Sequence, residues 1–142
     1  MSIAQMRTDL ATRAAVNTAL NCYEQPPDSI EPPAFVVGPL DTVTYHTEGM
    51  GTFGKPVTRF TFLCRVYVGR VDMEEAIIAL DPYLDPRDTG SIPYLLDDKQ
   101  GAAVSDTAGT DWTNVREARD VGAYDFGGIE YIGAELVVEM YV

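Results

Sequence analysis

In two stretches of the chain every second residue is apolar, and this pattern predicts two long strands. In the first, over Val57 to Gly69, the apolar positions are Phe60, Phe62, Cys64, Val66 and Val68. In the second, over Ile129 to Val142, they are Ile132, Ala134, Leu136, Val138, Met140 and Val142. A period of two places one face of each strand in a core and leaves the other face wet or against a partner.

Helical spacing of apolar residues predicts an N-terminal helix from Ser2 to about residue 19. Its apolar face comprises Ile3, Met6, Leu10 and Ala14. Ser2 followed three residues later by Gln5 fits a capping box, in which each side chain satisfies a free backbone amide. Asp9 and Arg13 form an i,i+4 pair in the favourable order.

Two further helices are predicted in the second half of the chain. The first is capped by Asp72, with Glu75 at its third position, and the pairs Asp81-Pro82 and Asp85-Pro86 are expected to end it. Its apolar stripe comprises Met73, Ala76, Ile77 and Leu80. A short helix capped by Ser91 is expected over 92–98, with a stop near residue 101.

The remaining segments predict short strands, loops and a hairpin. Four prolines at positions 26, 27, 32 and 33 exclude a helix and a central strand, so we expect an extended connector. Short strands are expected over Ala34–Gly38 and Thr42–Thr47, and loops over 48–56 and 101–111. The stretch Trp112–Phe126 is a strand with weak alternation, and Gly127-Gly128 suits the turn of a hairpin.

The order of elements is therefore α-β-β-β-α-(α)-β-β. Helices on one face of an antiparallel or mixed sheet belong to the α+β class. A length of 142 residues predicts a single domain over 1–142.

The net charge of the chain limits the kinds of molecule that it can bind. The chain has 10 Lys and Arg against 22 Asp and Glu, a formal net charge of −12. Such a field repels nucleic acid and anionic membrane surfaces, and no apolar run is long enough to span a bilayer. The N-terminus does not resemble a secretory signal, so we expect a soluble protein made in a cytoplasm. Cys22 and Cys64 are then expected to be free thiols.

Two motifs resemble ligand loops but lack the required chemistry. Residues 49–55 satisfy G-x-G-x-x-G and nearly satisfy a phosphate-binding loop, but Pro56 follows and a strand comes next where a helix is needed. Residues 85–90 can be aligned with a calcium loop, but Arg87 and Leu96 occupy positions that need oxygen ligands. A hairpin loop and capped turns are the better interpretations.

The sequence contains no convincing group of catalytic or metal-binding residues. His46 is the only histidine and has no local nucleophile motif, and one histidine with two distant cysteines cannot form a usual zinc site. Glu130, Glu135 and Glu139 could do acid–base work, but a solvated or interface-facing strand surface is the favoured interpretation. We therefore predict no enzyme activity, no catalytic residues, no cofactor and no metal.

Aromatic and charged residues outside the predicted core favour an interface with other protein subunits. The alternative is that they are ordinary apolar residues scattered over the surface. Met50 and Phe53 lie in a loop, the only tryptophan ends another, and Leu63, Tyr67, Val137 and Tyr141 lie among charges on the second faces of the long strands. The candidate assembly residues are His46, Glu48, Met50, Phe53, Arg59, Arg65, Tyr67, Trp112, Glu135, Glu139 and Tyr141.

Five segments, together with the Ala-rich N-terminal helix, resemble the tail terminator proteins of long-tailed bacteriophages, in particular those from phages of actinobacteria. The segments are Ile30–Gly38, Val66–Arg70, Ala79–Leu84, Gly90–Ile92 and Tyr124–Ala134. They are patterns of fold and turn and contain no catalytic signature. The resemblance covers nearly the whole chain.

The resemblance implies a structural virion protein of the tail neck, assembled in the host cytoplasm. Such proteins form a hexameric ring on the head-proximal end of the tail tube, end tube polymerisation, and offer a surface to the head–tail connector or completion protein. DNA passes through the lumen without specific binding, and an acidic lumen would let it slide. We expect loop 48–56 to reach a neighbouring subunit or the tube. The alternatives are another neck or connector protein, the tube protein itself, or a small ligand-binding domain or enzyme.

Overall fold

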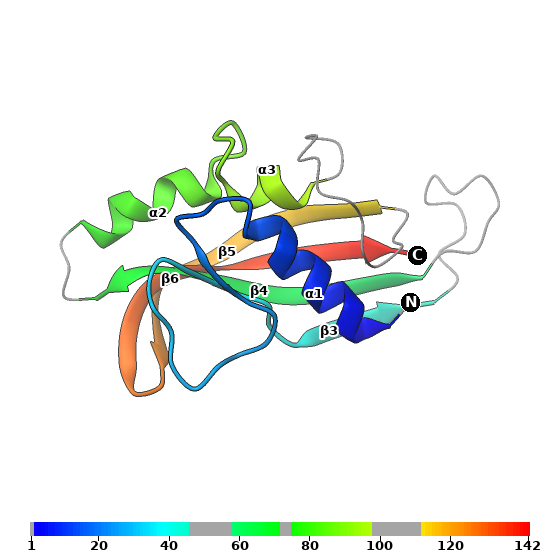
Figure 1. Ribbon diagram of the computed structural model, residues 1–142, viewed down its shortest axis with the longest axis horizontal. Helices are drawn as coiled ribbons and strands as arrows, with labels where there is room; N and C mark the ends of the chain where they lie inside the picture. Colours follow the sequence, from blue (N-terminus) through cyan, green and yellow to red (C-terminus); the bar gives the residue numbers. More distant parts are fainter. Residues whose placement is uncertain (1, 46–57, 72–74, 98–111) are drawn as a thin grey trace.

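Within residues 2–45, 58–71, 75–97 and 112–142, which the computed structural model describes, three helices cover one face of a six-stranded mixed sheet (Figure 1). The elements are α1 (Ile3–Ala14), β1 (Asn21–Tyr23), β2 (Ala34–Val36), β3 (Leu40–Thr44), β4 (Arg59–Arg70), α2 (Ala76–Leu84), α3 (Ile92–Leu96), β5 (Trp112–Phe126) and β6 (Ile129–Tyr141). The fold is of the α+β class, as the sequence predicted.

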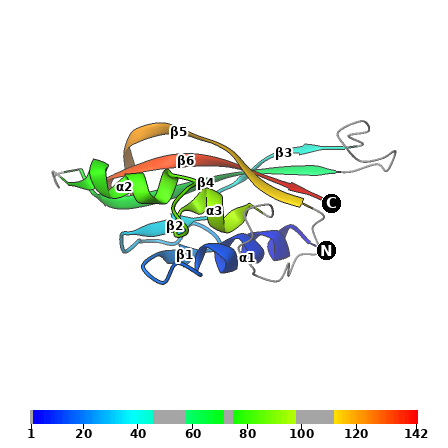
Figure 2. The ribbon, with the colours of Figure 1, turned by 90° about the horizontal axis from the view of Figure 1, so that it is seen from above.

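The strands run in the order β1-β2-β4-β6-β5, and β3 also pairs with β4. Only β1 and β2 are parallel; the other pairs among the described strands are antiparallel. Since β2 pairs with residues 65–67 of β4 and β3 with residues 59–62, these two short strands follow one another along the same edge of β4. Residues of α1, α2 and α3 all pack in one core against the sheet, and seen from above α1 and α3 lie to one side of β5 and β6 (Figure 2).

The helix-covered side of the sheet, here called the first face, holds the main core. Its fully buried strand residues include Phe62, Cys64, Val66, Ala134, Leu136, Val138 and Met140, and α1 contributes Met6, Leu10 and Ala14. These are the alternating positions that predicted the two long strands. The opposite side is called the second face below.

Helix α1 begins as predicted but ends earlier. Ser2 Oγ accepts from the Gln5 amide at 3.1 Å and Gln5 Oε1 accepts from the Ser2 amide at 2.7 Å, which completes the capping box. The predicted extension to residue 19 is wrong, because the chain after Ala14 turns through tighter bonds such as the Asn17 amide to the Ala14 carbonyl. Ile3 is also less buried than predicted, at 39% exposed.

Helix α2 differs from its prediction in two respects. Pro82 lies inside the helix, so the first Asp-Pro pair does not end it; the helix runs to Leu84 and stops at the second pair, Asp85-Pro86, as predicted. Ile77 was predicted in the buried stripe but is 61% exposed. The expected cap at residue 72 lies outside the described residues. In α3, Ser91 Oγ accepts from the Tyr94 amide as predicted, and the helix ends at Leu96 rather than at residue 98.

The connections around the sheet are partly as predicted. The proline-rich connector contains no helix or strand, and Gly127 and Gly128 have φ of +61° and +83° in the β5–β6 turn. Strand β1 was not predicted, and the short strands β2 and β3 end at Val36 and Thr44, before the predicted ends. No helix of the described part is long and apolar enough to cross a bilayer.

Candidate functional site

The second face carries an aromatic cluster of its own. Its buried members are Ile30, Ala34, Val36, Tyr67 and Tyr131, with Tyr23, Tyr124 and Phe126 packed against them. Tyr67 is at the centre, with its ring centroid 5.7–6.0 Å from those of Tyr124, Phe126 and Tyr131 in edge-to-face geometry. Edge-to-face packing places the positive ring edge on the negative face of the neighbour, so the hairpin and the connector are fixed against β4.

The chain passes very closely over β4 between β2 and β3. The Leu63 amide donates to the Pro39 carbonyl at 3.1 Å. A Cβ added to Gly38 would stand 1.7 Å from the Leu63 carbonyl oxygen, so only glycine fits there. From α1, Arg7 Nη1 donates to the Gly38 carbonyl at 2.6 Å. This segment therefore forms a rigid wall beside the second face.

Between this wall, the connector and the hairpin lies a hollow of about 230 Å³. We call it the second-face hollow. It is lined by Pro26, Val36, Gly38, Pro39, Leu63, Arg65, Tyr67, Phe126 and Glu135. Its walls are thus mainly apolar, with one arginine and one carboxylate.

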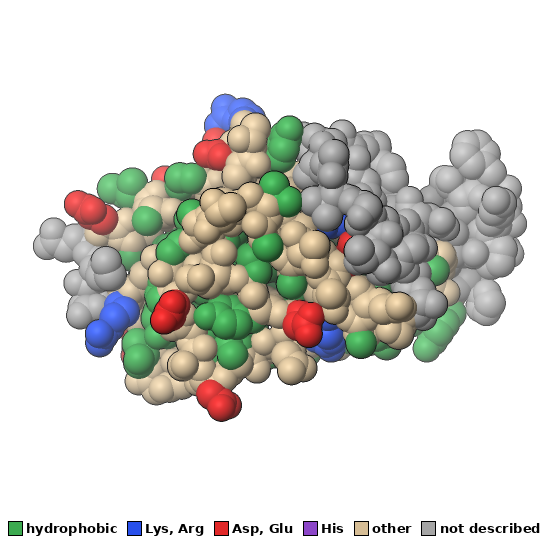
Figure 3. All heavy atoms as spheres, viewed as in Figure 1, with side chains coloured by type: hydrophobic (Ala, Val, Ile, Leu, Met, Phe, Trp, Pro, Cys, Tyr) green, Lys and Arg blue, Asp and Glu red, His purple; other side chains and the backbone are tan. Residues whose placement is uncertain are grey.

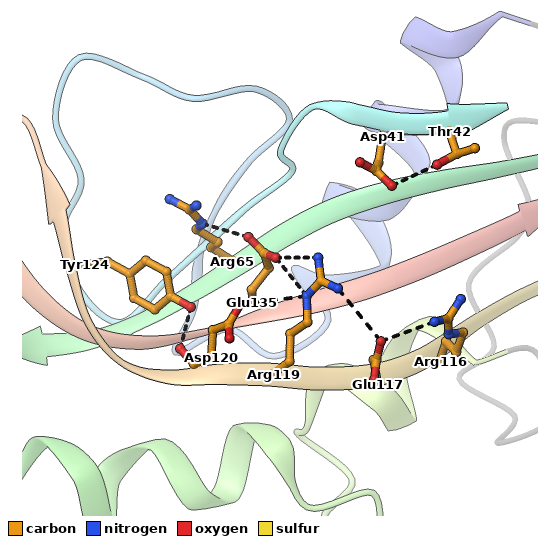
Figure 4. A network of polar contacts seen from close by, with 9 residues as sticks. All are labelled: Asp41, Thr42, Arg65, Arg116, Glu117, Arg119, Asp120, Tyr124 and Glu135. Carbon is orange, nitrogen blue, oxygen red and sulfur yellow. Dashed lines mark hydrogen bonds and ion pairs between the residues drawn. The ribbon is translucent and has the colours of Figure 1, made fainter.

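Glu135 binds one arginine on each neighbouring strand (Figure 4). Arg65 lies directly opposite Glu135 on β4, and its Nε donates to Oε2 at 3.4 Å. Arg119 on β5 also lies opposite Glu135, and its Nε and Nη2 atoms are 3.0 and 2.9 Å from Glu135 Oε1. The Glu135 side chain is 10% exposed, whereas those of Arg65 and Arg119 are 42% and 43% exposed. A buried carboxylate thus positions two partly exposed cations.

The electrostatics of this group stabilise the charged arginines. Burial would lower the pKa of Arg65, but its interactions with Tyr67 and Glu135 outweigh burial and raise that pKa. The hydrogen bond to Glu135 raises the pKa of Arg119. Arg65 also stacks on Tyr124, with Cζ 4.7 Å from the ring centroid. Burial and the Glu135 charge raise the pKa of the Tyr124 phenol, so this ring stays neutral and able to accept the cation.

A second ion pair lies further along the same face. Arg59 Nε is 3.4 Å from Glu139 Oε2, with side chains 26% and 6% exposed. Arg59 Nη2 also donates to Thr44 Oγ1 on β3 at 3.4 Å. Alternation along β4 and β6 therefore gathers both arginines and both glutamates of the candidate set on one face.

The candidate assembly residues fall into three groups. Arg59, Arg65 and Tyr141 are partly exposed on the second face. His46, Glu48, Met50 and Phe53 lie outside the described residues, together with loop 48–56 and the Trp112 side chain. Tyr67, Glu135 and Glu139 are 1%, 7% and 4% exposed, so the expectation of a solvated surface is wrong for these three, while their place in an interface stays a prediction. They are covered by aromatic rings and arginines of their own subunit.

The residues that sequence reasoning missed come mostly from β5 and the connector. Arg119, Tyr124, Phe126 and Pro26 all border the hollow or its ion pairs. Register shifts between Val115 and Glu117 and between Arg119 and Gly122 break the period of two in β5. The period of two that identified the faces of β4 and β6 therefore could not assign the faces of β5.

The described residues offer little for bond-making chemistry. Among them, no group of three His, Cys, Asp or Glu side chains could hold a metal ion. Both cysteines are free, and burial raises the pKa of Cys22 to about 11 and that of Cys64 to about 12, which keeps both thiols protonated near neutral pH. The second-face hollow offers an apolar recess bordered by the Arg65–Glu135 ion pair.

Comparison with known proteins does not assign the chain to a family. No protein-family model matches the chain, and no curated protein matches it significantly. The interpretation of the second face therefore depends on its geometry and on the resemblance carried by the five sequence segments.

Proposed function

We propose that this chain is the tail terminator of a long-tailed bacteriophage. Six copies form a ring on the head-proximal end of the tail tube, end tube polymerisation and join the tail to the head–tail connector. The ring works by assembly, without an enzymatic step. DNA passes through it without specific contacts.

The observation that carries this proposal is the convergence of three of the segments that resemble the family. Ile30–Gly38, Val66–Arg70 and Tyr124–Ala134 are far apart in sequence, yet together they supply Ile30, Ala34, Val36, Tyr67, Tyr124, Phe126 and Tyr131 of the second-face cluster. The resemblance is thus concentrated on one surface, next to a hollow. Five of these seven residues are buried, so the cluster is a small second core that supports the second-face hollow, and the hollow is the part open to a partner.

The charge is a second support. A net charge of −12 on each copy gives a ring a strongly negative field along a DNA path. Basic side chains would retain DNA by neutralising its phosphates. On the second face, Arg59, Arg65 and Arg119 are each paired with a carboxylate that offsets their charge, so this face is not a basic footprint for DNA.

The test is tail length in a phage that lacks the chain. Without a terminator, tails should grow to irregular lengths and remain without heads, and supplying the full chain should restore normal length and joining. Electron microscopy of the particles measures both. Antibody labelling should mark one band between tube and connector in normal virions.

Two results would overturn the proposal. One is tails of normal length, joined to heads, in the absence of the chain. The other is antibody label along the whole tube, which would identify a tube protein instead. A purified chain that turns over a substrate would favour the enzyme class.

A further inference from the structure

Helix α2 is apolar on both of its sides. Ala76 and Leu80 are buried against the core, yet Ile77 and Ile78 are 61% and 71% exposed. Over α2, the space-filling view shows hydrophobic side chains with acidic ones beside them (Figure 3). A helix that is hydrophobic all round is normally buried on all sides. The outer face of α2 therefore has the character of a surface that a partner covers.

The surroundings of this apolar pair are acidic. Glu75 and Asp81 flank it and are exposed. No lysine or arginine occurs in the sequence between Arg70 and Arg87. A partner for the outer face of α2 should thus present an apolar recess with a positive group at its border.

The second-face hollow has that chemistry. Pro26, Leu63 and Phe126 give it apolar walls, and Arg65, which is paired with the lining residue Glu135, keeps 42% of its side chain exposed at the border. Its volume of about 230 Å³ exceeds the roughly 150 Å³ that holds a benzene molecule in an engineered protein cavity. One branched aliphatic side chain fits within it.

We propose that the outer face of α2 on one copy docks into the second-face hollow of the next copy, with Ile78 in the hollow and Glu75 near Arg65. This inference rests on the proposed ring and names the contact that builds it. The two patches differ, so the contact is head-to-tail and can repeat around a ring. Copies with a net charge of −12 repel each other generally, which makes a contact at an arginine the favourable one.

The first test is sedimentation velocity of the full chain over a wide concentration range. Ile78→Glu should weaken self-association by roughly tenfold or more, because it places a charge in an apolar recess. Val16→Glu is the matched control, since Val16 is also an exposed aliphatic residue, at 53%, but lies just after α1. It should leave association unchanged, and thermal unfolding should show that both variants fold.

Charge exchange tests the second half of the contact. Arg65→Glu and Glu75→Arg should each weaken association, since each places like charges opposite one another between copies; thermal unfolding of Arg65→Glu measures its separate repulsion of Glu135 within the subunit. The double variant carries both changes on every copy and should recover most of the lost association. Recovery in the double variant requires that the two positions face each other between copies.

Cross-linking detects the contact even when it is transient. Ile78→Cys and Leu63→Cys chains, mixed at high concentration under a mild oxidant, should form a disulfide-linked pair. Val16→Cys mixed with Leu63→Cys should not, and wild-type chains give the background from Cys22 and Cys64.

The docking is overturned if self-association is unaffected by Ile78→Glu, or if the mixed cysteine variants give no linked pair above background. Either result leaves the tail-length experiment untouched, so the ring function could hold with another contact. Conversely, normal tails without the chain would refute the ring function while the purified chain still associated through α2.

Discussion

Gly38 lies so close to Leu63 that a Cβ on Gly38 would stand 1.7 Å from the Leu63 carbonyl oxygen. Since both residues line the second-face hollow, we expect Gly38→Ala to push the β2–β3 crossing off β4. The free energy of unfolding should fall by about 1–3 kcal/mol, as in other overpacked sites. Gly122→Ala is the control: a Cβ there meets nothing within 4 Å, and urea unfolding should show no loss.

A buried ion pair within α1 gives a second prediction. Asp9 Oδ2 and Arg13 Nε are 3.0 Å apart, and the side chains are 0% and 3% exposed. Asp9→Ala removes one charge and leaves the other buried, which should lower the free energy of unfolding by about 3–5 kcal/mol. Arg87→Ala breaks the exposed pair with Asp85 and should leave the urea midpoint unchanged. Equal effects of the two changes would contradict the role of burial.

Glu135 should matter more to stability than its neighbour Glu117. Glu135→Gln leaves Arg65 and Arg119 facing each other without their shared carboxylate, and we expect a loss of about 2–3 kcal/mol. Glu117 contacts Arg116 at 3.4 Å but is 42% exposed, so Glu117→Gln should have a small effect that salt abolishes. Unfolding at low and high salt distinguishes the two. A Glu135 effect that disappears in salt would be evidence of a surface pair.

Alkaline pH should destabilise the protein through Cys64. Burial raises the pKa of this thiol from its ordinary value of 9.0 to about 12. Between these values the unfolded chain loses the proton and the folded chain keeps it, so the free energy of unfolding falls as pH rises. One such group contributes a slope of about 1.4 kcal/mol per pH unit.

Cys64→Ala checks this slope. The variant should be less stable near neutral pH because it leaves a cavity in the core, yet its stability should decline less between pH 9 and 11. Cys22→Ala is a useful comparison, since the pKa of Cys22 is raised only to about 11. An unchanged slope in Cys64→Ala would show that other groups cause the alkaline loss.

The sequence predicted the first face of the sheet well, for a physical reason. Cys64 and Leu136 belong to the stretch of β4 and β6 that keeps a period of two, before the register shift between Tyr67 and Gly69, and they are paired across the two strands. Wherever that period holds, burial can be assigned from the pattern alone. The capping box at Ser2 was predicted equally well, because it depends only on residues three positions apart.

The second face could not be predicted in the same way. Glu135 looks like a surface residue in sequence, and its burial depends on Arg119, which reaches it across a strand with two register shifts. Tyr67 is buried by rings from a hairpin some 60 residues further along the chain. Ile77 fitted an amphipathic stripe, but α2 carries apolar residues on its inner and its outer face, so periodicity did not distinguish the two.

The long sequence span of the hollow has a consequence for the timing of association. Its lining runs from Pro26 to Glu135, whereas the exposed isoleucines of α2 lie at positions 77 and 78. At a synthesis rate of about 5–20 residues per second, α2 precedes Glu135 by roughly 3–12 seconds. If α2 docks as proposed, a nascent chain exposes the outer face of α2 before its own second-face hollow is complete. Neighbouring chains on one messenger therefore cannot form a closed series of contacts until their translation is nearly complete.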